Sequence, residues 1–119
     1  MALFIVEKLV SGMMVLDLRG RVVLGPETES LRERVKRLLE AGHLRLVLNL
    51  EEVSYVDSVG LSTLVACYTS VRKQGGELKL LNLTKRIHDL LQITKLSTVF
   101  EVYDTLEAVE RSFGPPPSP

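Results

Sequence analysis

The stretch that decides the fold is residues 53–64, which read VSYVDSVGLSTL and join a strand pattern to a helix pattern. Before it, residues 44–50 carry leucine at every second position. A period of two with one apolar face is typical of a strand packed against helices on one side. After it, apolar residues recur at helical spacing, at Leu61, Leu64, Val65, Tyr68 and Val71. Residues 51–57 are therefore predicted to form a loop from the carboxyl end of a strand to the amino end of a helix.

The chain before this stretch predicts a hairpin followed by a helix. Residues 3–9 and 13–18 read as two strands, joined by a short turn at Ser11-Gly12, and Gly20 ends the pattern. Gly25-Pro26-Glu27 is a helix start, because proline fits the first turn and glutamate favours its positive end. The apolar stripe of this helix is Leu31, Val35, Leu38 and Leu39, and Ala41-Gly42 ends it.

The chain after this stretch continues the alternation of strands and helices. Gly75-Gly76 stops the preceding helix, and residues 77–82 read as a strand. Thr84 opens a helix that carries Ile87, Leu90 and Leu91. A short strand near residues 99–102 and a helix over residues 105–113 follow. Residues 114–119 form a proline-rich tail with nothing to pack, which we expect to fray.

This order of elements predicts a single α/β domain over residues 1–113. Repeated strand–helix–strand units imply parallel pairing, and such crossovers are almost always right-handed. If consecutive strands lie side by side, equal handedness places successive helices on the same face. We therefore expect a small, mixed, mostly parallel sheet with an N-terminal hairpin and helices mainly on one face.

Composition disfavours nucleic acids and membranes as partners. Fifteen basic and fifteen acidic residues cancel, whereas a nucleic-acid binder usually has a basic surplus. Aromatic residues make up 5% of the chain and there is no tryptophan to stack on single strands. No window reaches the ~20 consecutive apolar residues that cross a bilayer, and the start lacks the basic region of a signal peptide. We expect a cytoplasmic protein.

The residues that usually carry metal or catalytic chemistry are sparse. Cys67 is the only cysteine and lies in an apolar helical stretch, so a buried structural thiol is expected. His43 and His88 are far apart and have no ligand spacing around them. No nucleophile elbow and no phosphate-binding loop occurs. The sequence therefore predicts no enzyme, no metal and no cofactor.

The helix start at Asp57-Ser58 has two interpretations. Either side chain would cap the helix, and capping alone explains the pair. A serine at an accessible helix start is also well placed to carry phosphate, because free N–H groups and the positive dipole end stabilise the added charge. Gly60 would leave the backbone of the first turn accessible. The residues alone leave both interpretations open.

Residues 55–61, YVDSVGL, resemble the phosphorylation-site motif of STAS-domain anti-sigma factor antagonists, in which Asp-Ser is followed by any residue and then Gly-Leu. The resemblance covers almost the whole chain. Family-like features recur at Gly20, Gly25-Pro26-Glu27, Val47-Leu48-Asn49-Leu50 and Gly75-Gly76. Two positions depart from the family: Ser62 stands where a second glycine is frequent, and Asn49 where aspartate is frequent.

The resemblance implies a STAS fold and a function in partner switching. Ser58 would be phosphorylated by an anti-sigma factor that is also a serine kinase, and a serine phosphatase would reverse the reaction. The unphosphorylated chain would bind the anti-sigma factor and release its sigma factor for transcription. Partner contacts are expected at Leu24, Asp57, Ser58, Val59, Gly60, Ser62 and Thr63.

Two alternatives stay open within the same family. The chain could be a static STAS interaction module of a larger signalling assembly, or a STAS module that binds a small ligand at the carboxyl edge of its sheet. STAS domains also occur as the cytosolic parts of anion transporters, which the lack of a membrane-spanning segment disfavours.

Overall fold

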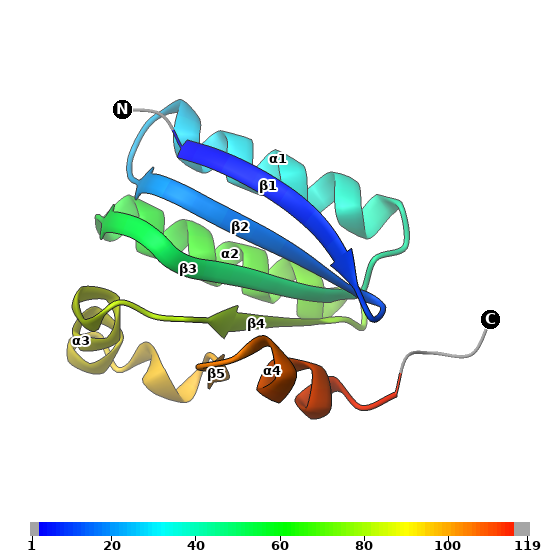
Figure 1. Cartoon of the computed structure of the whole chain (residues 1–119). Coiled ribbons are helices and arrows are strands. Elements are labelled where there is room, and N and C mark those ends of the chain that lie inside the picture. Colours follow the sequence, from blue (N-terminus) through cyan, green and yellow to red (C-terminus); the bar gives the residue numbers. More distant parts are fainter. Residues whose placement is uncertain (1–2, 116–119) are drawn as a thin grey trace.

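The computed structural model describes residues 3–115 as one five-stranded sheet with helices on both faces (Figure 1). The strand order is β1-β2-β3-β4-β5, with β1 antiparallel to β2 and all other neighbours parallel. This confirms the predicted α/β class, the mixed sheet and the N-terminal hairpin. The elements in chain order are β1 (Leu3–Val10), β2 (Met13–Val22), α1 (Pro26–Glu40), β3 (Arg45–Val56), α2 (Ser58–Lys73), β4 (Glu77–Leu81), α3 (Lys85–Ile93), a 3₁₀ turn (Leu96–Thr98), β5 (Val102–Tyr103) and α4 (Leu106–Phe113).

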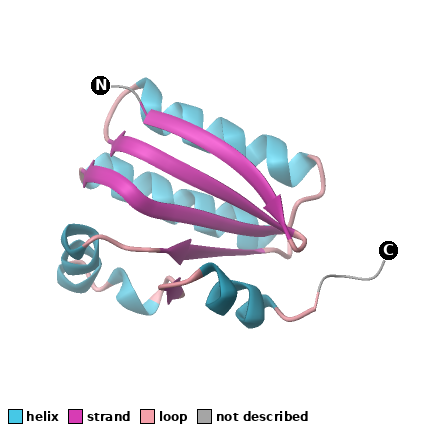
Figure 2. Ribbon diagram, viewed as in Figure 1, coloured by secondary structure: helices cyan, strands magenta, loops and turns pink. Residues whose placement is uncertain are grey.

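The main core lies between the sheet and helices α1 and α2, which run side by side on one face (Figure 2). The alternating leucines of β3 point into this core and are fully buried. The stripe residues Leu31 and Val35 of α1 and Leu64 and Val71 of α2 meet them there, as their helical spacing predicts.

Helix α4 covers part of the opposite face and builds a second, smaller core. Val109 and Phe113 of α4 pack there against apolar side chains of β2, β3 and β4. Val47 is fully buried in this cluster, although its position among polar neighbours in β3 indicated an exposed face. The sheet is therefore covered by helices α1 and α2 on one face and partly by α4 on the other.

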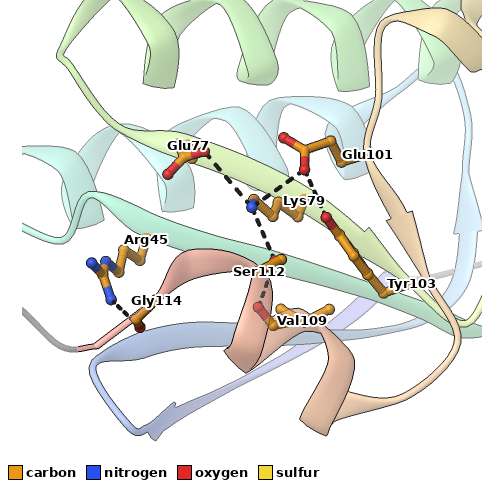
Figure 3. A network of polar contacts seen from close by, with 8 residues as sticks. All are labelled: Arg45, Glu77, Lys79, Glu101, Tyr103, Val109, Ser112 and Gly114. Atoms are coloured by element: carbon orange, nitrogen blue, oxygen red, sulfur yellow. Dashed lines mark hydrogen bonds and ion pairs between the residues drawn. The ribbon is translucent and has the colours of Figure 1, made fainter.

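A buried lysine anchors α4 to the sheet (Figure 3). The side chain of Lys79, in β4, is 2% exposed, and its Nζ donates a hydrogen bond to Ser112 Oγ at 3.0 Å. The same Nζ lies 4.4 Å from the ring centroid of Phe113 and 3.4 Å from Glu101 Oε1. Because a hydroxyl, an aromatic face and a carboxylate surround the ammonium group, its burial is compensated.

Strands β2 and β3 are longer than the sequence predicts. The pattern was expected to break at Gly20 and to give a loop over residues 51–57, but both strands continue and pair with each other up to Val22 and Val56. Two register shifts occur along this extension, one of them between Gly20 and Arg21, and Gly20 has a φ of 117°. Such irregularities erase the period of two while the strands stay paired, so the prediction was wrong here.

The segment between α3 and α4 also differs from the prediction. A strand was expected near residues 99–102, whereas a 3₁₀ turn precedes the short strand β5. Lys95, with a φ of 62°, starts this turn, and Phe100 is buried in the main core.

Within the described part of the chain, no helix is long and apolar enough to cross a membrane. Of the predicted tail, residues 116–119 lie outside the described residues.

Candidate functional site

The start of α2 lies at the edge of the sheet where β2 and β3 end. Asp57 follows β3 directly in an extended conformation and is the N-cap, and Ser58 is the first helical residue. The Asp57 Oδ1 atom accepts a hydrogen bond from the Gly60 N–H at 2.7 Å, and the Asp57 carbonyl accepts from the Leu61 N–H at 2.9 Å. The sequence allowed either residue to cap the helix, and the structure assigns the cap to Asp57.

Ser58 is exposed on the first turn of α2. Val59 beside it is also exposed, with 37% of its surface accessible. One turn further, Ser62 is exposed and its Oγ donates to the Ser58 carbonyl at 3.0 Å. The Ser58 side chain is therefore accessible to an approaching protein.

Asp57 also reaches the loop between β2 and α1. Its Oδ2 accepts a hydrogen bond from the Leu24 N–H at 2.9 Å. The N–H groups of Leu24 and Gly60 hold the pKa of the Asp57 carboxyl below its ordinary value, because they stabilise its charged form. The Leu24 side chain is 72% exposed. The Asp57 carboxylate thus links Leu24, the predicted contact residue of the loop, to the first turn of α2, which carries the other predicted contact residues.

Gly60 is buried, which overturns the expectation that it opens the backbone to solvent. A Cβ at this position would lie 1.9 Å from the Val22 carbonyl oxygen. The same oxygen accepts a hydrogen bond from the Asp57 N–H at 3.3 Å. Glycine is therefore needed because the first turn of α2 approaches the end of β2 too closely for any side chain.

The predicted contact residues do not all lie on the surface. Thr63 is 3% exposed and its Oγ1 donates to the Val59 carbonyl at 2.9 Å, so it faces the interior with Gly60. Val22 at the end of β2 is fully buried, whereas Leu24 two residues later is 72% exposed. The exposed part of the predicted site consists of Leu24, Ser58, Val59 and Ser62, with Asp57 half-buried among them.

Two arginines beside this site were missed by sequence reasoning. The guanidinium groups of Arg21 and Arg86 lie 5.5 Å and 5.7 Å from the ring centroid of Tyr55. Arg21 also contributes to lowering the pKa of Asp57. No sequence signal placed Arg21 there, because the strand that carries it was expected to end before it.

The two departures from the motif family have local explanations. The Asn49 Nδ2 atom donates to Asp17 Oδ1 at 2.9 Å on the sheet, where an aspartate would face a second carboxylate. Ser62 lies on the exposed surface of α2.

Within residues 3–115, no group of three His, Cys, Asp or Glu side chains could hold a metal ion. Cys67 is 3% exposed, and burial raises the pKa of its thiol to about 11.

Known proteins resemble this chain both in sequence and in fold. The family model described as the STAS domain matches residues 6–109. The anti-sigma-B factor antagonist of Bacillus subtilis is 43% identical over 72 residues, which cover 60% of this chain and 65% of that relative's length. The anti-sigma factor antagonist SpoIIAA in its unphosphorylated form matches with a TM-score of 0.73 and 21% identity, over 95% of this chain and 99% of that one. The Bacillus cell fate determinant SpoIIAA in its phosphorylated form gives a TM-score of 0.70 and 20% identity, over 93% and 99%.

Proposed function

Because this chain belongs to the STAS domain family, we propose that it is an anti-sigma factor antagonist whose binding is switched by phosphorylation of Ser58. The observation that carries the proposal is the exposed Ser58 at the first position of α2, which lies beside exposed Val59 and next to Asp57, the residue that binds the backbone N–H of exposed Leu24. A partner that covers this surface would bury the hydroxyl.

The relatives support the proposal. The B. subtilis relative is named as an antagonist of an anti-sigma factor, and the matched region includes more than half of this chain. SpoIIAA adopts this fold in both its unphosphorylated and its phosphorylated form. A fold that persists in both forms suits a switch that acts at the surface and leaves the core unchanged.

Charge explains how such a switch would act. A phosphate adds about −1.5 to −2 charges at neutral pH. The Gly60 N–H, which could have compensated part of that charge, already donates to Asp57. The phosphate would therefore stand beside an existing carboxylate, and a partner fitted to a neutral hydroxyl would meet both bulk and negative charge. The positive end of the α2 dipole still tolerates the modification, so the fold is retained.

The partners follow from this function. The unphosphorylated chain would bind an anti-sigma factor that is also a serine kinase, and the bound sigma factor would be released. A serine phosphatase would restore the binding form in the cytoplasm. In this scheme the chain itself is a substrate and a binding protein, and it catalyses no reaction.

The test uses purified full-length chain and the kinase-type anti-sigma factors of the source organism, purified one at a time. Wild type and Ser58→Ala should bind one of them with similar affinity by calorimetry, and Ser58→Asp should bind at least tenfold more weakly. With radiolabelled ATP, label should enter wild type and Ser62→Ala but not Ser58→Ala. Equal binding of Ser58→Asp would refute the switch and leave a static interaction module.

A further inference from the structure

We infer that Asp57 is a positioning residue: its carboxylate holds the Leu24 segment against the start of α2, so that two distant parts of the chain present one preformed binding surface. The inference rests on the proposed function for the identity of the partner. It assigns to Asp57 a role in shaping the surface, in place of the direct partner contact that the motif suggested.

The two oxygens of Asp57 serve two different segments. Oδ1 accepts from the Gly60 N–H at 2.7 Å within the same helix turn. Oδ2 accepts from the Leu24 N–H at 2.9 Å across a separation of 33 residues. A helix cap needs only the first of these bonds, so the second is not explained by capping.

The surrounding residues leave Leu24 dependent on this second bond. On one side of it, Val22 is fully buried at the end of β2. On the other side, Thr28 is 4% exposed and its Oγ1 donates to the Gly25 carbonyl at 3.0 Å. Leu24 lies between these anchors with 72% of its side chain exposed, so side-chain packing contributes little to its position.

The charge of Asp57 is part of the arrangement. Hydrogen bonds to a carboxylate are shorter and stronger than those between neutral groups. The Leu24 N–H lowers the pKa of Asp57 more than any other group does, because a donated hydrogen bond stabilises the charged carboxylate. Asparagine at position 57 would still cap α2 through its oxygen, but it would turn an N–H group toward the Leu24 N–H.

Loss of the bond would weaken partner binding without any lost contact to the partner. A segment that samples several conformations binds only from its competent fraction, so the apparent Kd rises by the inverse of that fraction. If the competent fraction falls to about one tenth, the affinity falls about tenfold. Phosphorylation of Ser58 acts at the same place, because the added charge lies next to the carboxylate that holds Leu24.

The experiment measures amide exchange with solvent by NMR in wild type, Asp57→Asn and Asp57→Ser, all as full-length chains. In both variants the Leu24 amide should exchange at least tenfold faster, while the Gly60 amide, still capped, should change less than about twofold. Thr84→Ala is the control. It removes the cap of α3, in which Thr84 Oγ1 accepts a hydrogen bond from the Ile87 N–H at 3.2 Å, and it should leave the exchange rate of the Leu24 amide unchanged. In wild type, the Leu24 resonance should also titrate with the low pKa of Asp57.

The outcomes separate positioning from general destabilisation. Equal acceleration at Leu24 and Gly60 would mean that Asp57 only stabilises the helix, and unchanged exchange at Leu24 would mean that the bond does not hold the loop. Either result overturns the inference. In the binding assay, Asp57→Asn should bind the anti-sigma factor about tenfold more weakly than wild type, and equal affinity also overturns it. Failure of wild type to bind any anti-sigma factor would instead refute the proposed function.

Discussion

Replacing Gly60 by alanine tests how closely α2 approaches β2. The new Cβ would lie 1.9 Å from the Val22 carbonyl oxygen and 2.7 Å from the Val22 carbonyl carbon. Backbone atoms in a paired strand cannot rotate aside as a side chain can, so α2 has to shift. Overpacking of this kind costs about 1–3 kcal/mol, and the better helix propensity of alanine returns about 1 kcal/mol. Because the contact is with backbone, we expect the upper part of the range and a net loss of about 1–2 kcal/mol.

The assay is urea unfolding at neutral pH, followed by circular dichroism. The midpoint should fall with an unchanged slope, and the Tm should fall by roughly 4 °C for each kcal/mol lost. Ser62→Ala is the matched control, because it raises helix propensity in the same helix on an exposed position. It should leave the free energy of unfolding within about 0.5 kcal/mol of wild type. A Gly60→Ala variant as stable as wild type would refute the close approach of α2 to Val22.

Three further predictions concern buried or ionised side chains. Lys79→Ala should lower the free energy of unfolding by about 2–4 kcal/mol, because it empties a buried site under α4. Lys79→Met, which fills the site, should lower it by less than about 1 kcal/mol. Equal urea midpoints for the two variants would contradict this. Tyr103 and Lys79 hold the pKa of Glu101 below its ordinary 4.5, so its contribution to stability is complete above the unfolded pKa and is lost as the pH falls through the lower folded value. Glu101→Gln should therefore flatten the acid limb of urea midpoints measured between about pH 5 and 3, and an unchanged limb would disprove this role. Cys67, whose pKa is raised to about 11, should react with a thiol reagent at neutral pH only as fast as the chain unfolds, and rapid labelling of the folded chain would show that it is accessible.

The sequence was sufficient where the signal is periodic and local. The alternating leucines of β3 and the helical stripe after Leu61 predicted both elements and the face of the sheet on which α1 and α2 pack. Pro26 marked the start of α1, and Asp57-Ser58 marked the start of α2. The motif around Ser58 pointed to the family that the STAS match over residues 6–109 then showed.

The same reasoning failed where the pattern is interrupted. The register shifts near Gly20 hid the last part of β2, and with it the position of Arg21 beside Tyr55 and Asp57. Lys79 shows the same limit, because a charged residue in a short strand gives no sign that its side chain lies under a helix that follows later in the chain.

By itself, then, the sequence determined the order of the elements and the class of the fold, because both depend on spacing between near neighbours, and the resemblance of residues 55–61 to a known motif pointed to the family. Only the tertiary structure decided that α4 packs on the second face, that Gly60 must lack a side chain opposite Val22, and that Asp57 holds Leu24. These contacts join residues that are distant along the chain. Their geometry depends on how strands pair and helices pack, and no local pattern encodes it.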